Sequence, residues 1–167
     1  MIDLKPLSND AIPGALAKAE RYRLLNEPGE AESICRDVLH GDPENQQALA
    51  VLLLCLTDQF ERAPALAVKE ARDILPRLRD DYERTYYRGL VSERRAKAEL
   101  RRGTVGCGHA AYEWFREAMA WFEKAEAIRP AGNDECILRW NACARNLNRD
   151  SQLQPRPDEE PEPLMSE

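Results

Sequence analysis

The chain has few aromatic residues and no long apolar segment. Aromatic residues make up 7% of its 167 positions, and the longest apolar run, residues 48–56, has about half of the ~18 residues that a membrane-spanning helix requires. The first residues show no positively charged stretch followed by an apolar one, which is the pattern of a secretory signal. These absences exclude a membrane-spanning protein and predict a cytoplasmic location.

Paired cysteines are also missing. The five cysteines, Cys35, Cys55, Cys107, Cys136 and Cys143, contain no C-x-x-C pair, and their odd number fits reduced thiols better than a disulfide framework. Cys107 and His109 offer two metal ligands, but a closed zinc site takes four, and no second pair lies nearby in the sequence. We therefore expect no metal and no cofactor.

Recognisable catalytic motifs are absent as well. The sequence has no Gly-rich phosphate loop, no H-E-x-x-H and no G-x-S-x-G. The net charge of −6 is concentrated in residues 151–167, where five acidic residues stand against Arg156 alone, so the rest of the chain is nearly neutral. We expect a protein that is not an enzyme and whose overall charge selects no partner.

Helical signals dominate, and no run of alternating β-branched residues predicts a strand. Proline and glycine lie at positions that separate helices, while residues 151–167 are rich in Pro and Glu and almost without apolar side chains. The predicted helices are about 8–25, 28–40, 44–59, 62–79, 81–102, 110–128 and 133–148. We therefore predict an all-α fold of about seven helices followed by a disordered acidic tail that joins no core.

Two segments share one pattern, in which a small residue, a bulky one and another small one precede a proline. Its members are Ala31, Cys35, Val38 and Pro43 in the first segment, and Ala118, Phe122, Ala125 and Pro130 in the second. This spacing resembles the second half of a tetratricopeptide repeat, a helix pair of about 34 residues. The small residues let the two helices of a pair lie close together, and the proline ends the second helix. The resemblance implies a right-handed superhelical stack of antiparallel helix pairs.

The same resemblance divides the chain into parts. Residues 1–11 precede a helical domain at 12–150, and the tail covers 151–167. The repeats are about 12–45, 46–81 and 82–132, and a terminal helix at 133–148 covers the last apolar face. The third repeat contains about 17 additional residues, which lengthen both of its helices, and Gly89 lies where the family has a glycine in the first helix.

Members of this family present a concave groove, lined by the first helix of each pair, that binds peptides or other proteins. The resemblance therefore implies a non-catalytic scaffold or adaptor with a protein or peptide partner. It assigns to the groove Ala50, Val51, Leu54, Asp58, Tyr86, Tyr87, Leu90, Arg94, Asn141 and Arg145, with Leu24 and Leu138 also at groove positions. Such a groove has an apolar centre flanked by tyrosines and mixed charges, which suits an apolar partner segment.

An alternative function rests on four arginines that share one face of the helix predicted at 81–102. They are Arg84, Arg88, Arg95 and Arg102. This arginine stripe suits a nucleic acid or another anionic surface, unless its members pair locally, as Arg95 would with Glu99. Because few aromatic residues are interleaved with the arginines, we expect a protein partner rather than nucleic acid.

The terminal helix leaves another alternative open. Apolar residues cover much of the circumference of 133–148, more than one buried face requires, which favours a homo-oligomeric structural protein. Trp114 lies among the additional residues of the third repeat, so it belongs either to the core or to an exposed interface.

Overall fold

The structure is a computed structural model that describes residues 2–62 and 64–157. Within these residues it is all-helical, with seven α-helices and no strand, which confirms the predicted fold class. The helices are α1 (Ile12–Leu24), α2 (Pro28–Gly41), α3 (Gln46–Thr57), α4 (Pro64–Ile74), α5 (Asp81–Arg102), α6 (Cys107–Ala127) and α7 (Glu135–Arg149). Short 3-10 turns at Asn9–Ala11 and Leu75–Arg77 precede α1 and follow α4.

Local side chains and glycines set the helix ends. The side chain of Asn45 accepts a hydrogen bond of 2.9 Å from the Ala48 N–H at the start of α3, and Asp80 accepts one of 2.8 Å from the Glu83 N–H at the start of α5. Gly103 ends α5 with a left-handed φ of 62°. The turn that follows is shorter than predicted, because α6 begins at Cys107 rather than near residue 110.

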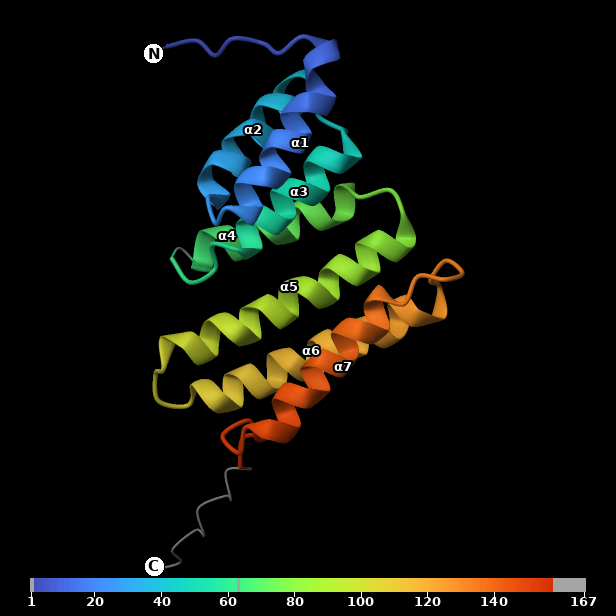
Figure 1. Cartoon of the computed structure of the whole chain (residues 1–167). Coiled ribbons are helices and arrows are strands. Elements are labelled where there is room, and N and C mark those ends of the chain that lie inside the picture. The colour runs from blue at the N-terminus through green and yellow to red at the C-terminus, as the bar shows by residue number, and fades with distance from the viewer. Residues whose placement is uncertain (1, 63, 158–167) are drawn as a thin grey trace, which may run out of the picture.

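The helices follow one another in a stack, from α1 at the top of Figure 1 to α7 at the bottom, with α5 across the middle. Each helix contacts the next one in the chain. In addition, α1 contacts α3, α3 contacts α5 and α5 contacts α7. Each odd-numbered helix therefore neighbours the next odd-numbered one.

Helix α5 separates two hydrophobic cores. Its Val91 and Ala98 belong to a core built mainly from α1–α4, whereas its Tyr82 and Ala96 belong to a core built with α6 and α7. The small and bulky residues of the repeat pattern are buried, each at most 1% exposed: Ala31 and Cys35 lie in the first core, Ala118, Phe122 and Ala125 in the second, and Val38 in a smaller cluster with Leu16 and Ala48. Their predicted place in the core is confirmed.

A close approach between helices lies between α5 and α6, the two longest of the described helices. A Cβ atom built on Gly89 would come within 2.6 Å of Cε1 of Phe122, which is closer than packed carbon atoms can approach. Phe122 is 1% exposed, so its ring has little space into which to move. A glycine at position 89 is therefore what allows α5 to lie this close to α6.

The predicted boundary of the acidic tail is wrong at its start. Leu153 is 4% exposed and belongs to the core of α6 and α7. The backbone carbonyl of Gln152 lies where a side chain on Gly108 would be, and the carbonyl oxygen of Gln154 lies 2.9 Å from Nδ1 of His109. Residues 152–154 thus pack against the start of α6 and the core beside it, whereas the end of the predicted tail, 158–167, lies outside the described residues.

The close approach at Gly89 makes a direct prediction. Gly89→Ala should lower the free energy of unfolding by about 1–3 kcal/mol, as an added methyl group in a packed core does, even though alanine favours a helix by about 1 kcal/mol over glycine. Gly14→Ala in α1 is the matched control, because its added Cβ would meet no atom within 4 Å, and it should not destabilise the fold. Urea unfolding of both variants tests this. If Gly89→Ala is as stable as the unchanged protein, the space between α5 and α6 can accept a methyl group and the prediction is wrong.

Candidate binding groove on the odd-numbered helices

The structure separates the predicted groove residues into two groups. Val51 is 4% exposed and Leu90 2% exposed, so both belong to the interior, and the prediction that they line an exposed groove is wrong. Neighbouring helices lie close enough to cover both side chains. The others remain accessible: Ala50, Leu54, Asp58, Tyr86, Tyr87, Arg94 and Asn141 are half-buried and Arg145 is exposed. None of the described helices is long and apolar enough to cross a membrane.

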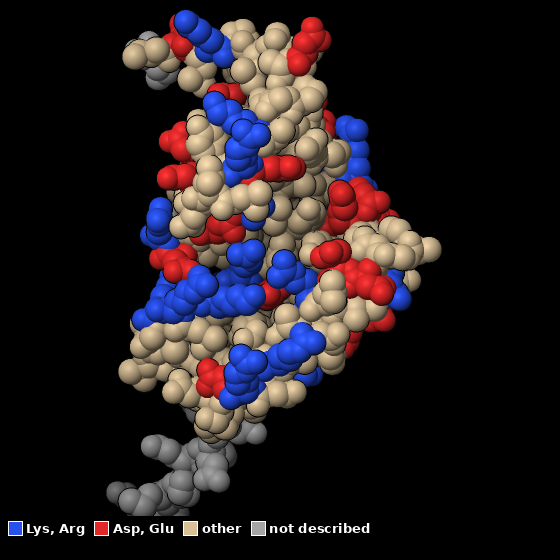
Figure 2. Space-filling view, viewed as in Figure 1, with Lys and Arg blue, Asp and Glu red and all other residues tan. Residues whose placement is uncertain are grey.

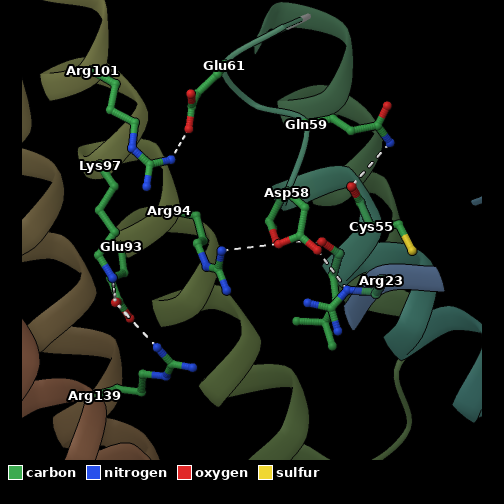
Figure 3. A network of polar contacts seen from close by, with 12 residues as sticks. Arg23, Cys55, Asp58, Gln59, Glu61, Glu93, Arg94, Lys97, Arg101 and Arg139 are labelled. Atoms are coloured by element: carbon green, nitrogen blue, oxygen red, sulfur yellow. Dashed lines mark hydrogen bonds and ion pairs between the residues drawn. The ribbon is translucent and has the colours of Figure 1, made fainter. Parts of the chain in front are cut away.

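A shared carboxylate links three of the odd-numbered helices. Asp58, directly after α3, accepts a hydrogen bond of 2.8 Å from Nε of Arg23 in α1, and its other oxygen lies 3.1 Å from Nη1 of Arg94 in α5. Figure 3 shows Asp58 between the two guanidinium groups. All three side chains are 19–31% exposed, so water weakens the pairing but does not remove it. Two cations share one anion, and the cluster keeps a positive charge.

A second shared carboxylate links α5 to α7. Glu93 is fully buried, and its Oε1 lies 3.6 Å from Nη1 of Arg139 and also pairs with Nζ of Lys97 (Figure 3). Among the described residues its Oε2 has no hydrogen-bond partner. Burial, with the negative charge of Glu93 nearby, raises the pKa of the Cys143 thiol to about 12. A buried carboxylate of this kind is stable only with its cations in place, so it fixes α7 against α5.

A pocket of about 480 Å³ opens where the ends of α1 and α3 approach the C-terminal half of α5. Its charged lining consists of Arg23, Arg62, Arg94, Lys97 and Arg101 against Asp58 and Glu61. Glu61 and Arg101 form an ion pair, and Nε of Arg94 is buried without a partner among the described residues. Figure 2 shows the Lys and Arg side chains gathered in a band at this level. The predicted apolar centre is therefore wrong at this end, where the groove is polar and cationic. We call it the cationic pocket.

Three tyrosines of α5 form a packed aromatic cluster beside the groove. The ring of Tyr86 lies 5.9 Å from that of Tyr82, 5.4 Å from that of Tyr87 and 5.9 Å from that of Phe122. Burial raises the pKa of Tyr82 and that of Tyr87 to about 12. Burial also raises the pKa of Tyr86, although Arg139 beside its hydroxyl opposes the shift. The cluster holds Tyr86 and Tyr87 in place while part of each side chain stays accessible.

The predicted arginine stripe is not continuous. Arg84 donates a hydrogen bond of 2.6 Å to the Leu78 carbonyl and pairs with Asp81, and Arg102 lies 3.4 Å from Glu99. The predicted pairing of Arg95 with Glu99 is therefore wrong, because Glu99 pairs with Arg102 instead.

The other two stripe arginines stack on tryptophans of α6. The guanidinium carbon of Arg95 lies 3.9 Å from the ring centroid of Trp114, and that of Arg88 lies 4.9 Å from the ring centroid of Trp121. Trp114 is half-buried and packs against the core of α6 and α7, so it is not the exposed interface residue that was the alternative prediction.

The cysteines and histidines do not assemble a reactive centre in the described part of the chain. There, no three His, Cys, Asp or Glu side chains come together as metal ligands. A hydrogen bond between the thiols of Cys35 and Cys55 lowers the pKa of Cys35 and raises that of Cys55. Both side chains are 0% exposed, so the lowered pKa does not provide a nucleophile that a substrate can reach.

The buried phenol of Tyr87 predicts a loss of stability at high pH. Its pKa of about 12 in the folded chain lies above the usual value of about 10, so its contribution is complete below about pH 10 and is lost as pH rises towards 12. Tyr87→Phe has no hydroxyl to ionise and should lose up to about 2 kcal/mol less stability over this interval. Urea unfolding at several pH values measures the free energy of unfolding of both proteins. The same dependence of this free energy on pH in the two proteins would contradict the prediction.

No family model, no curated protein and no solved structure matches this chain. The tetratricopeptide resemblance therefore rests on the spacing of the chain's own residues. What the groove can bind depends on the side chains that line it. The most distinctive of these belong to the cationic pocket and to the half-buried tyrosines beside it.

Proposed function

We propose that the chain is a non-catalytic scaffold of the tetratricopeptide type, a right-handed superhelical stack whose concave groove binds an acidic segment of a partner protein. Three features support the architecture. The odd-numbered helices contact one another in sequence, as the first helices of stacked pairs do. The small and bulky pattern residues of the first and third repeats are buried, and Gly89 allows the close approach of α5 to α6 within the third pair. We place this scaffold in the cytoplasm.

The cationic pocket is the observation on which the choice of partner rests. Five cationic side chains and two acidic ones line it, so it keeps a positive charge after its internal ion pairs have formed. A carboxylate of a partner would relieve the repulsion among these cations. An acidic side chain or the carboxyl terminus of a chain supplies such a group.

Accessible apolar side chains on the same helices indicate that the partner segment is also partly apolar. Leu24 is 87% exposed and Leu138 60% exposed, and both lie at positions that the resemblance assigns to the groove. Leu54 and Tyr87 are half-buried on the same set of helices. Apolar anchors of this kind provide much of the binding energy in peptide grooves, whereas charges set the orientation and the choice of partner. The partner segment therefore combines acidic and apolar residues.

Selection from a displayed random-peptide library tests the proposal without knowledge of the natural partner. The selected peptides should be enriched in Asp and Glu interspersed with apolar residues. Binding of one such peptide should weaken about fivefold in Arg101→Gln and strengthen in Glu61→Gln, because the first variant removes a cation and the second frees that cation from its partner. Isothermal titration calorimetry measures both changes.

The matched control is Arg149→Gln, which removes one positive charge at the end of α7, at an exposed residue that does not line the pocket. It should leave the affinity nearly unchanged. Opposite effects of the Arg101 and Glu61 variants exclude a general loss of folding as the cause. Peptides that bind all three variants equally, or a library that yields no acidic peptide, would refute the groove assignment.

A further inference from the structure

A second cleft lies on the opposite flank of α5, between α4, α5 and α6. One hollow of about 480 Å³ has an apolar floor of Phe60, Val68 and Ala98 and a rim that includes Lys69 and Arg72. A second hollow of about 240 Å³ contains Trp114 and Trp121, and the two hollows share Arg72 and Arg95. Their size is that of small-molecule sites, and none of the five cations of the cationic pocket lines them.

Three arginines line this cleft, two of them beside Trp114 and one beside Trp121. Arg95 lies 3.9 Å and Arg72 5.9 Å from the ring centroid of Trp114, and Arg88 lies 4.9 Å from that of Trp121. Within the described residues, none of the three has a carboxylate oxygen within the 4.0 Å of an ion pair. Arg72 comes from α4 and the other two from α5, so packing of two helices brings these like charges together.

The chain itself compensates this positive charge only in part, because three carboxylates, those of Asp73, Glu99 and Glu117, line the two hollows together with five cations. Partial burial lowers the pKa of Arg95, and the neighbouring Arg72 and Arg102 lower it further, while Glu99 and Glu117 oppose the shift. Like charges held at a half-buried position repel one another, and an anion in the cleft would convert that repulsion into attraction. The indole rings hold the Arg88 and Arg95 side chains against α6, so a ligand would meet groups that are already in position.

We propose that this cleft binds the phosphate group of a small ligand through Arg72 and Arg95, which line both hollows and lie beside the same indole ring. A phosphate dianion matches two guanidinium groups in charge and offers oxygens for paired hydrogen bonds. The apolar floor beside it suits a flat organic body, as in a nucleoside monophosphate. Long nucleic acid fits less well, because Arg84 and Arg102 are engaged by neighbouring groups of the chain and the remaining cations face a cleft rather than an extended track.

Calorimetric titration of the full chain with AMP, inorganic phosphate and adenosine tests the site. AMP and inorganic phosphate should both bind, AMP more tightly, whereas adenosine alone should not. Binding of inorganic phosphate as tight as that of AMP would leave free phosphate as the ligand of Arg72 and Arg95. Arg95→Gln and Arg72→Gln should each weaken AMP binding by about tenfold or more, as the loss of a charged hydrogen bond does. Arg149→Gln should leave it unchanged.

Tryptophan fluorescence locates the bound ligand. In Trp140→Phe the remaining tryptophans are the two of the cleft, and AMP should change their emission with the same affinity that calorimetry gives. Because Arg72 is exposed, its variant retains the fold even if Arg95→Gln does not. The proposal fails if AMP produces no saturable heat at millimolar concentration, or if adenosine binds as well as AMP. It also fails if a single-stranded oligonucleotide binds more tightly than AMP and Arg72→Gln leaves its affinity unchanged.

Discussion

The structure depends on α5, a helix of 22 residues that has to be covered on both sides at once. Val91 and Ala98 close the core of α1–α4, whereas Tyr82 and Ala96 close the core of α6 and α7. The contact of Gly89 with Phe122 brings α6 close enough to bury the second of these sides. A helix with two opposite apolar sides keeps only two narrow flanks for polar groups, and both flanks of α5 are cationic.

These two flanks account for both proposals. On one flank, Arg94, Lys97 and Arg101 meet the ends of α1 and α3, where Asp58 and Glu61 neutralise only part of their charge. On the other flank, Arg88 and Arg95 are held by tryptophans of α6 and are joined by Arg72 of α4. In both places the packing of several helices gathers cationic side chains on one flank. The net charge of the helical part is near zero, so it does not reveal this local concentration of positive charge.

Local patterns predict much of this molecule, and long-range packing determines the rest. Proline and glycine give the helix ends within a few residues, and the repeat spacing identifies buried positions such as Ala31 and Phe122. The burial of Leu153 is not predicted because its neighbours in the chain are polar or proline, and only its packing against the core of α6 and α7 reveals it. The repeat resemblance assigns Val51 to the groove although it is buried, because the spacing of residues in the sequence does not show which positions neighbouring helices cover. The Arg23–Asp58 pair joins residues 35 apart in sequence, beyond the reach of helical periodicity.

The central claim is that α5 makes the two cores one cooperative unit. All three tryptophans, Trp114, Trp121 and Trp140, lie after α5, so their fluorescence reports on the second core, whereas far-ultraviolet circular dichroism reports on all helices. Urea unfolding followed by both signals should give coincident transitions, and Leu53→Ala, in α3 of the first core, should lower both midpoints equally. Separate transitions, or a Leu53→Ala shift seen by circular dichroism alone, would contradict the account.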